Sequence, residues 1–285
     1  MSRLLHIAMA STSSLPGEVE RNLEQIAGFV RRAATDGADL LLTPELSACG
    51  YGSYPDVLAT AEVAGEGPIS RRALALAAES GVVLGIGFAE RNDRLTISHI
   101  FAFPDGTFVV QRKNSPTGDE APFEKPKGAA SIQPFTVRGV CCGTLICADA
   151  GLRKREALLA GAGVEVVLLP SGAGGKRSAR VITRELATKK GRQTYIAALQ
   201  TLFWPGAQVE ECIARGRSQA TVNLTGFDGR VHFHGGHGSL TNALGEVVAF
   251  FPGQPNLDRQ FPTYAHAVID ADARVSSKTR GDKKQ

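Results

Sequence analysis

Short runs of apolar and β-branched residues recur along most of the chain, and each of them predicts a buried strand. The runs lie at Leu4–Ala10, Asp39–Leu42, Val82–Ala89, Ile97–Phe103, Phe108–Val110, Val140–Ile146, Val164–Leu169, Ala220–Asn223, Gly238–Thr241, Val247–Phe251 and Ala265–Ile269. This is a large number of strands for a single sheet. The pattern therefore indicates more than one sheet.

Apolar positions with helical spacing occur between the first two predicted strands. They are Val19, Leu23, Ile26, Val30 and Ala33. We expect Pro16 to begin this helix and Gly37 to end it. Three further helices are predicted over Ser70–Ser80, Leu152–Leu159 and Ser178–Lys190.

Strands and helices alternate early in the chain, whereas the centre and the C-terminal part run more from strand to strand. This order favours an α/β fold of two packed sheets over a doubly wound single sheet. The expected architecture is a four-layer α-β-β-α sandwich of two mainly mixed sheets with the helices outside. Since no convincing linker interrupts the pattern, residues 1–275 are predicted to form one domain and residues 276–285 a basic, flexible tail.

The composition, with 43% hydrophobic and 21% charged residues, is typical of a soluble globular protein. The formal net charge is +4, but much of it comes from the last ten residues, which hold Lys278, Arg280, Lys283 and Lys284 against Asp282. The body is almost neutral, which disfavours nucleic acid as a partner. No apolar run approaches the ~20 residues that cross a bilayer, so no membrane partner is expected.

The cysteines are odd in number and lack paired metal spacing: Cys49, Cys141, Cys142, Cys147 and Cys212. This usage suits a reducing compartment better than a disulfide scaffold, and a cytoplasmic location is expected. Cys141 and Cys142 are adjacent in a predicted strand. Their side chains should face opposite sides, with at least one of them in the core.

Three polar residues with complementary chemistry follow predicted strands: Glu45, Lys113 and Cys147. A rigid sheet can hold residues at such positions against a cleft. In acyl transfer a thiolate attacks, a carboxylate moves protons and an ammonium stabilises the developing oxyanion. Taken singly, each residue is equally compatible with a structural role, as a solvated strand end or a small core side chain.

Several segments around these residues share the motifs of one known family. They are Pro44-Glu45-Leu46 with Gly50-Tyr51, Pro104-Asp105-Gly106 with Gln111-Arg112-Lys113, Glu120 three residues before Phe123, the stretch from Gly143 to Asp149, and Gly238-Ser239-Leu240 with Gly245-Glu246-Val247. In this order they resemble the nitrilase superfamily of carbon-nitrogen hydrolases. The resemblance covers nearly the whole chain from Leu4 to Ile269.

The resemblance implies a role for each matched residue. Glu45 is expected to be the general base, Lys113 the oxyanion stabiliser and Cys147 the nucleophile. Glu120 is implied as a second carboxylate that orients Lys113 and the leaving amine, and the backbone N–H of Ala148 as a further oxyanion donor. A thiol with an ordinary pKa of ~8.5 is mostly protonated at neutral pH, so a nearby lysine and base would make it useful.

Tyr51 and Ser171 are implied as further residues of the oxyanion and substrate site. The implied function is hydrolysis of a small-molecule linear amide through a thioester on Cys147, without a cofactor or metal. N-carbamoyl and nitrile hydrolysis stay open, although the small Ala148 argues against nitrilases proper, which tend to carry Trp-Glu after the nucleophile. A catalytically reduced binding member of the family is a further alternative. The resemblance also implies a homodimer or higher homo-oligomer packed through helices.

The chain departs from the family pattern in two places. Residues 150–156 stand where the family usually has an Arg-aromatic-Pro-Glu run. The segment between Ser171 and Asn223 is longer than expected, so that helices over 178–190 and 209–219 compete for one family helix. This segment is expected to cap the site or to extend an interface.

Two further patterns are typical of other kinds of site. His232, His234 and His237 suggest metal ligands for a metal-assisted hydrolysis, and the first two would share one face of a strand. Satisfied or pocket-lining histidines are favoured, because no carboxylate or cysteine partner accompanies them. The stretch 172–178 resembles a phosphate cradle but fails the P-loop pattern at Pro170 and at Arg177, so a surface loop is favoured.

Overall fold

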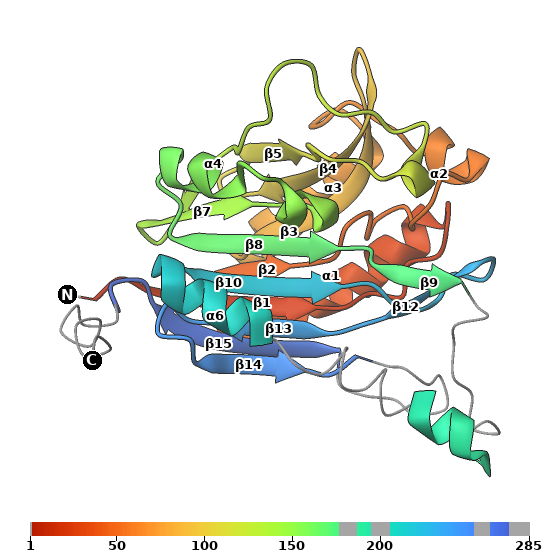
Figure 1. The fold of residues 1–285 in the computed structure, drawn as a ribbon. Helices are drawn as coiled ribbons and strands as arrows, with labels where there is room; N and C mark the ends of the chain where they lie inside the picture. Colours follow the sequence, from red (N-terminus) through yellow and green to blue (C-terminus); the bar gives the residue numbers. More distant parts are fainter. Residues whose placement is uncertain (1, 177–186, 195–205, 254–262, 274–285) are drawn as a thin grey trace.

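Two six-stranded sheets packed face to face form the centre of the protein (Figure 1). The computed structural model describes residues 2–176, 187–194, 206–253 and 263–273. Helices cover the outer face of each sheet, so the layers are helices, sheet, sheet and helices. The expected four-layer α-β-β-α sandwich is confirmed.

The first sheet has the strand order β15-β1-β2-β3-β4-β5. Its strands are β1 (Leu4–Ala10), β2 (Leu40–Leu42), β3 (Val83–Arg91), β4 (Leu95–Ala102), β5 (Phe108–Arg112) and β15 (Tyr264–Asp270). The strands β1, β2 and β3 are parallel, whereas β15, β4 and β5 are antiparallel to their neighbours. The helices that precede β3 are α1 (Val19–Thr35), α2 (Pro55–Ala59) and α3 (Pro68–Ser80).

The second sheet has the order β14-β13-β10-β8-β7-β6, and a three-stranded sheet β11-β12-β9 adjoins it. The strands of these sheets are β6 (Phe135–Val137), β7 (Val140–Thr144), β8 (Val166–Ser171), β9 (Gly174–Lys176), β10 (Ser218–Asn223), β11 (Thr225–Phe227), β12 (His232–Gly235), β13 (Gly238–Thr241) and β14 (Val247–Phe251). The helices here are α4 (Arg155–Gly161) and α6 (Gly206–Arg215), with short 3-10 turns η1 (Gly118–Glu120) and η2 (Cys147–Gly151). None of the described helices is both long and apolar enough to cross a membrane.

The first strand shows why the apolar runs are continuous rather than alternating. Leu5, Ile7 and Met9 pack between the sheets against residues of β7, β8 and β10, whereas Ala8 and Ala10 pack on the other face against α1 and α3. A strand that is buried on both faces needs apolar residues at successive positions. This double burial makes the strands recognisable in the sequence.

Some element boundaries differ from those predicted. The helix expected over 209–219 is α6, which ends at Arg215, because Ser218 and Gln219 begin a strand that pairs with β8. The short strand β6 and the short helix α2 follow no long apolar period and were not predicted. The helix expected over 178–190 falls largely outside the described residues, as do the predicted tail 276–285 and the end of the predicted domain.

Candidate active site

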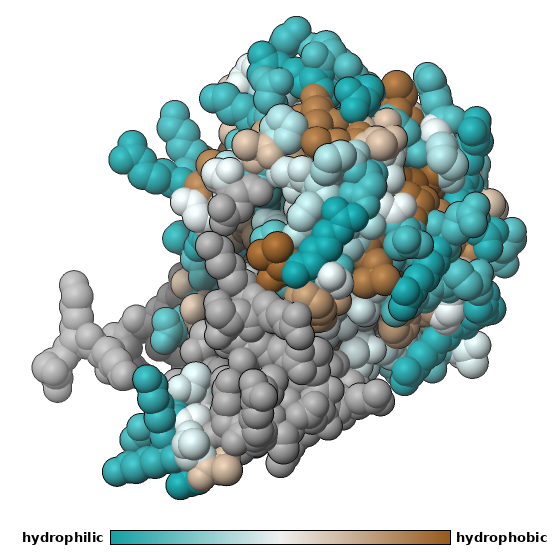
Figure 2. Space-filling view, turned by 90° about the vertical axis from the view of Figure 1, so that its right-hand side faces the viewer, coloured by the Kyte–Doolittle hydropathy of each residue, from teal (hydrophilic) through white to brown (hydrophobic). Residues whose placement is uncertain are grey.

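The carboxyl ends of parallel strands from both sheets meet at one end of the sandwich. In the first sheet, β2 leads to Glu45 and β5 leads to Lys113; in the second, β7 leads to Cys147. The arrows of β8 and β10 in Figure 1 point toward this end. Viewed from there, hydrophobic residues lie in several separate places among hydrophilic ones (Figure 2). The strand directions alone therefore bring the three predicted residues to the same end.

A buried lysine is held between two buried carboxylates. The Nζ atom of Lys113 donates to Oε1 of Glu45 at 2.7 Å and to Oε1 of Glu120 at 2.6 Å. All three side chains are at most 1% exposed. The second oxygen of Glu120 accepts a hydrogen bond from the backbone N–H of Thr117 at 2.7 Å. We call Glu45, Lys113 and Glu120 the lysine cluster.

Burial and the charges of the lysine cluster shift the pKa values of Glu45 and Lys113. Burial, and then the charge of Glu120, raises the pKa of the Glu45 carboxyl to about 7, although Lys113 acts in the opposite direction. Burial alone would lower the pKa of Lys113, but the two carboxylates outweigh it and raise this pKa. The lysine therefore stays an ammonium, while Glu45 is able to exchange a proton near neutral pH.

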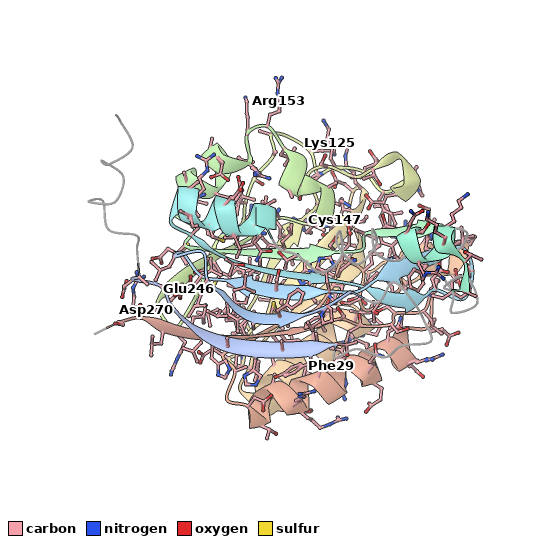
Figure 3. All side chains as sticks on the ribbon, turned by 60° about the horizontal axis from the view of Figure 1, so that its bottom comes forward. Phe29, Lys125, Cys147, Arg153, Glu246 and Asp270 are labelled. Carbon is pink, nitrogen blue, oxygen red and sulfur yellow. The ribbon has the colours of Figure 1, made fainter. Side chains whose placement is uncertain are left out.

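Cys147 begins the turn η2 in a backbone conformation that non-glycine residues rarely adopt, with φ of 47°. Its side chain is half-buried, and Figure 3 places it inward of Arg153 and Lys125, whose exposed side chains project from the surface. The hydroxyl of Ser171 donates to its Sγ at 3.2 Å. The following residue, Ala148, lies in the same turn.

The thiol of Cys147 is neutral at rest. Burial raises its pKa, as does the negative charge of Glu45, whereas Lys113 and the hydrogen bond from Ser171 lower it. A neutral thiol is a weak nucleophile, so it needs a base to take its proton when a substrate is bound. The neighbouring residues Ser171 and Gly172 bond to Cys147 and to Glu45 respectively, which places the cysteine beside the lysine cluster.

Gly172 joins the cysteine side of the site to the glutamate side. It follows Ser171, and its backbone N–H donates to Oε2 of Glu45 at 2.9 Å. A Cβ atom at this position would approach Cδ2 of Tyr51 to 2.4 Å, closer than real Cβ contacts. Because glycine has no side chain, the end of β8 can approach the side chains of both Glu45 and Tyr51.

Tyr51 extends the lysine cluster toward the histidines of β12. Its hydroxyl donates to Oε1 of Glu120 at 2.8 Å. The rings of His232 and His234 lie edge-on to its ring, with centroids 5.7 and 5.4 Å away. Burial and the nearby carboxylates Glu45 and Glu120 raise the pKa of the phenol, so Tyr51 stays a neutral donor.

Replacing Tyr51 with phenylalanine should slow turnover by about tenfold. A hydrogen bond to a charged group contributes ~1.5–3 kcal/mol, and the substitution removes the bond to Glu120 but keeps the ring. The matched control is Tyr54→Phe, because Tyr54 donates to Asp228 instead, at 3.1 Å. We would compare kcat and melting temperature for the two variants. Full activity in Tyr51→Phe would show that the hydroxyl of Tyr51 is not needed for turnover and that the ring only packs.

Two of the three histidines and part of the glycine-rich stretch lie on the neighbouring strands β12 and β9. His232 and His234 share β12, as predicted, and burial lowers the pKa of His234 to about 4. Among the described residues, no group of three or more His, Cys, Asp or Glu side chains is placed to hold a metal ion. Where a surface loop was favoured, the structure has β9, which pairs with β12; Arg177 falls outside the described residues.

Asp149 is a buried carboxylate of the site. The sequence indicates it only as the last residue of the motif that runs from Gly143 to Asp149. It is 0% exposed and lies two residues after Cys147. Its Oδ2 accepts hydrogen bonds from the backbone N–H groups of Ile146 and Asn114, both at 3.2 Å. An aspartate next to a candidate nucleophile is a signal in the sequence, but nothing in the sequence indicates which two segments it joins.

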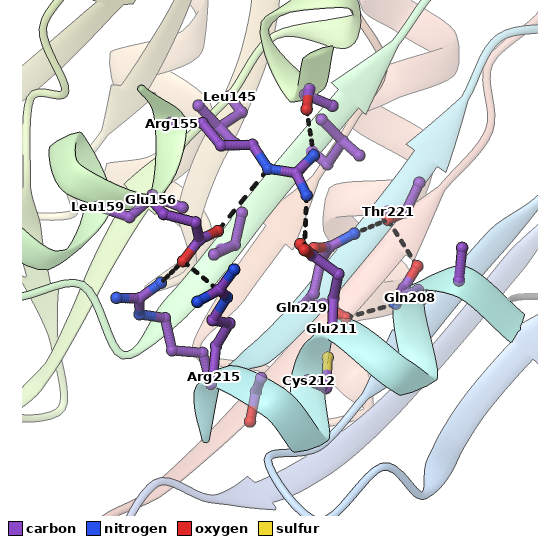
Figure 4. Close-up of a pocket in the computed structure, with 16 residues that line it drawn as sticks. Leu145, Arg155, Glu156, Leu159, Gln208, Glu211, Cys212, Arg215, Gln219 and Thr221 are labelled. Carbon is purple, nitrogen blue, oxygen red and sulfur yellow. Dashed lines mark hydrogen bonds and ion pairs between the residues drawn. The ribbon is translucent and has the colours of Figure 1, made fainter. Parts of the chain in front are cut away.

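A cavity of about 290 Å³ lies away from the lysine cluster, on the outer face of the second sheet between α4 and α6 (Figure 4). Ion pairs cross it, from Arg155 to Glu211 at 2.6 Å and from Arg217 to Glu156 at 2.7 Å. Arg155 also donates to the backbone carbonyl of Ala150 in the turn η2. The stretch 150–156, which departs from the family pattern, therefore contributes to this outer cavity.

The comparison with family models identifies the class of protein. The model of the carbon-nitrogen hydrolase family matches residues 6–200, and the chain belongs to this family. The predicted resemblance to the nitrilase superfamily is thereby confirmed. An amidase from Nesterenkonia sp. has a similar structure, with a TM-score of 0.72 at 20% identity over 95% of this chain and 92% of that one. At this identity the likeness shows the shared fold.

Two curated relatives differ from each other in activity. A glutamine-dependent NAD(+) synthetase of Xylella fastidiosa is 28% identical over 253 residues, which are 84% of this chain and 42% of that protein. A citrullinase of Francisella tularensis subsp. tularensis is 27% identical over 182 residues, 60% of this chain and 62% of that protein. The chain thus spans less than half the length of the synthetase.

Proposed function

We propose that the protein hydrolyses a non-peptide carbon-nitrogen bond, a linear amide, through a thioester on Cys147, and releases ammonia or an amine. The observation that carries the proposal is the lysine cluster, a buried ammonium fixed between two carboxylates beside a half-buried thiol. Burying three ionisable groups together is costly for folding unless each is paired. Such an arrangement is typical of a site that stabilises charge during a reaction.

The proposed acylation begins when Glu45 takes the proton of Cys147. The thiolate attacks the amide carbon, and the ammonium of Lys113 with the N–H of Ala148 stabilises the oxyanion. Glu45 then gives the proton to the leaving nitrogen, and the carbon-nitrogen bond breaks as the carbonyl re-forms. Glu120 keeps Lys113 in place and lies near the leaving amine. The products of this half-reaction are a thioester and free ammonia or amine.

In the proposed deacylation, water replaces the amine. Glu45 takes a proton from the water, whose oxygen attacks the thioester carbon, and the same oxyanion donors act again. Collapse of the intermediate breaks the carbon-sulfur bond, and Glu45 returns the proton to the thiolate of Cys147. The acid leaves and the thiol is restored, so both half-reactions use only groups of this chain and water.

A substrate panel would test the proposed function. Primary amides, including glutamine, would be compared with ureido and N-carbamoyl compounds and with nitriles for ammonia release. Intact-protein mass spectrometry would trap the acyl-enzyme by its added mass. We expect release from an amide and a single adduct on Cys147. No release from any compound, with no adduct, would favour a binding role for this family member.

Hydrolysis of an N-carbamoyl or ureido compound is the second candidate. The similarity to a citrullinase favours it, and the same residues would perform the chemistry. The panel separates the two candidates by which compounds release ammonia. A homo-oligomer and a cytoplasmic location stay predictions from the sequence; light scattering of the purified protein would measure the first.

Activity should depend on pH through Glu45. Because only the ionised carboxylate accepts a proton, kcat/KM should fall as the pH is lowered through the Glu45 pKa of about 7. Glu45→Gln should reduce turnover by ~10²–10⁴-fold and remove this limb of the profile. Glu124→Gln, which changes an exposed carboxyl paired with Arg94, should leave both unchanged.

The same substitution should change how stability depends on pH. The folded pKa of Glu45 lies above its ordinary value of 4.5, so between these two values the native state binds more protons than the unfolded state. The contribution of Glu45 to the free energy of unfolding is therefore present below about pH 4.5 and is lost as the pH rises through about 7. Urea unfolding at several pH values should show a smaller decline in Glu45→Gln; an equal decline would contradict the raised pKa.

A further inference from the structure

Asp149 links the segment that carries the lysine to the segment that carries the cysteine. A single oxygen, Oδ2, accepts the backbone N–H of Asn114 and the backbone N–H of Ile146, each at 3.2 Å. Asn114 directly follows Lys113, and Ile146 directly precedes Cys147. The first segment leaves the first sheet and the second leaves the second sheet. One side-chain atom therefore joins the two sheets at the site.

Both joined segments are held on their other sides as well. The side chain of Asn114 donates to the carbonyl of Ser131 and accepts the N–H of Ser131, each at 3.0 Å. The backbone N–H of Asp149 donates to the carbonyl of Ile146 at 3.0 Å, so that the turn closes around Cys147. Asp149 thus connects the lysine segment directly to the turn that carries Cys147, while Asn114 is held by Ser131 in the loop before β6.

The turn that begins at Cys147 needs such support. The positive φ of Cys147 is a conformation that persists only where the surrounding structure holds it. The carboxylate of Asp149 receives the N–H immediately before this residue. Losing that acceptor would leave two buried N–H groups unpaired and would release the turn toward ordinary backbone angles.

We propose that Asp149 is a positioning residue that sets the spacing between the Lys113 ammonium and the Cys147 thiol by accepting one hydrogen bond from each segment. The inference rests on the proposed function and adds to it a residue that touches neither substrate nor reacting atoms. It acts through the position of an acceptor atom and not through its charge. A carboxyl oxygen accepts these two N–H groups whether or not the other oxygen is protonated.

Two features of Asp149 agree with a role as a hydrogen-bond acceptor that does not require the carboxyl to be ionised. Its second oxygen, Oδ1, has no hydrogen-bond partner among the described residues. Burial raises the pKa of the Asp149 carboxyl, while the backbone N–H groups of Asn114, Ile146 and Ser115 and the charge of Lys113 act against the rise. An amide at this position would therefore keep the oxygen that matters and replace only the unpartnered one.

Three substitutions separate position from charge. Asp149→Asn keeps the acceptor and removes the charge; Asp149→Glu keeps the charge and displaces the acceptor by one methylene; Asp149→Ala removes both. The matched control is Asn242→Ala, because Oδ1 of Asn242 also accepts two backbone N–H groups, from Leu244 at 3.0 Å and from Glu246 at 2.9 Å, in a turn between β13 and β14. The control loses the same kind of contact away from the site.

The readout is the rate at which iodoacetamide alkylates Cys147 at different pH values, followed by peptide mass spectrometry. In Asp149→Glu and Asp149→Ala, Lys113 should lower the pKa of the Cys147 thiol less than it does in the wild type. The pH profile of alkylation should therefore move up by about one pH unit, and alkylation near pH 7 should slow by about tenfold. Asp149→Asn should stay within about threefold of the wild-type rate, since the acceptor remains. Asn242→Ala should melt earlier with an unchanged profile.

Two results would overturn the proposal: a wild-type profile in folded Asp149→Glu, or a loss in Asp149→Asn as large as in Asp149→Glu. If Asp149→Ala does not fold, the Asn and Glu variants still decide the question, because they make opposite changes. Alkylation needs no substrate. A wild-type protein that hydrolyses nothing in the panel would contradict the proposed function, while the alkylation profiles would still decide the role of Asp149.

Discussion

Replacement of Cys147 by alanine is expected to abolish hydrolysis, with a loss of at least ~10⁴-fold on the best substrate of the panel. The substitution removes the proposed nucleophile, and none of the three groups in the lysine cluster can form a thioester. The side chain of Cys147 is half-buried, and its backbone has a positive φ that alanine and cysteine tolerate equally poorly. The stability of the folded state should therefore change little. Circular dichroism and melting temperature would verify folding.

The matched control for this substitution is Cys141→Ala. Cys141 is also a partly exposed thiol of the same segment, but it lies on β7 before the site and contacts the carbonyl of Ala162. This variant should retain turnover and alkylation at Cys147. Hydrolysis by Cys147→Ala at a rate comparable with wild type would refute the thioester mechanism and return attention to the histidines of β12.

Replacement of Lys113 by methionine should cost both activity and stability. Loss of one oxyanion donor typically lowers kcat by ~10²–10³-fold. It also leaves Glu45 and Glu120 buried without their cation, and breaking a buried pair in this way costs about 3–5 kcal/mol. The cost should shrink at low pH, because protonation removes the charge of Glu45, whose pKa is raised by burial. The melting temperature of Lys113→Met should therefore approach that of wild type as the pH falls.

The neighbouring Arg112 offers a control for the loss of stability. Its guanidinium pairs with the buried carboxylate of Glu90, with Nε donating to Oε2 at 2.7 Å, on the other side of β5 from the site. Arg112→Met should also unfold more easily, but alkylation of Cys147 should keep its wild-type pH profile. In Lys113→Met the profile should move to higher pH, since a cation near the thiol is lost. Equal profiles in the two variants would contradict the proposed role of Lys113.

Much of the fold could be predicted because most of its strands are apolar runs. The run at Gly238–Thr241 is buried throughout and was predicted with the same bounds that β13 has. The run at Val247–Phe251 was also predicted with the bounds of β14, although three of its five apolar residues are exposed. The short strand β6 escaped because its central residue, Thr136, is exposed between two buried positions, which leaves no long apolar run. Helix α2 has only five residues and buries only Val57, too little for a helical period.

The residues gathered at the site could be predicted, but their order in space could not. Positions at the ends of strands identified Glu45, Lys113 and Cys147, and the family resemblance added Glu120 and Tyr51. The resemblance implied that Glu120 orients Lys113, but the sequence does not tell that Lys113 donates to both glutamates at once, since that depends on how far β5 runs beside β4. Nor does the sequence tell that one oxygen of Asp149 accepts hydrogen bonds from segments of both sheets. Such contacts depend on side-chain geometry across the sandwich.

The pairing of β1 with β15 has a consequence for how the chain folds during synthesis. Leu4 pairs with Asp270, and Arg3 contacts Asp272 across 269 residues of chain. While the ribosome is still making the middle of the chain, β1 can pair with β2 but has a free edge on its other side. An uncovered strand edge recruits other chains, and contacts so distant in sequence form slowly. A nascent chain halted before β15 should therefore aggregate or engage chaperones, because the edge of β1 stays uncovered.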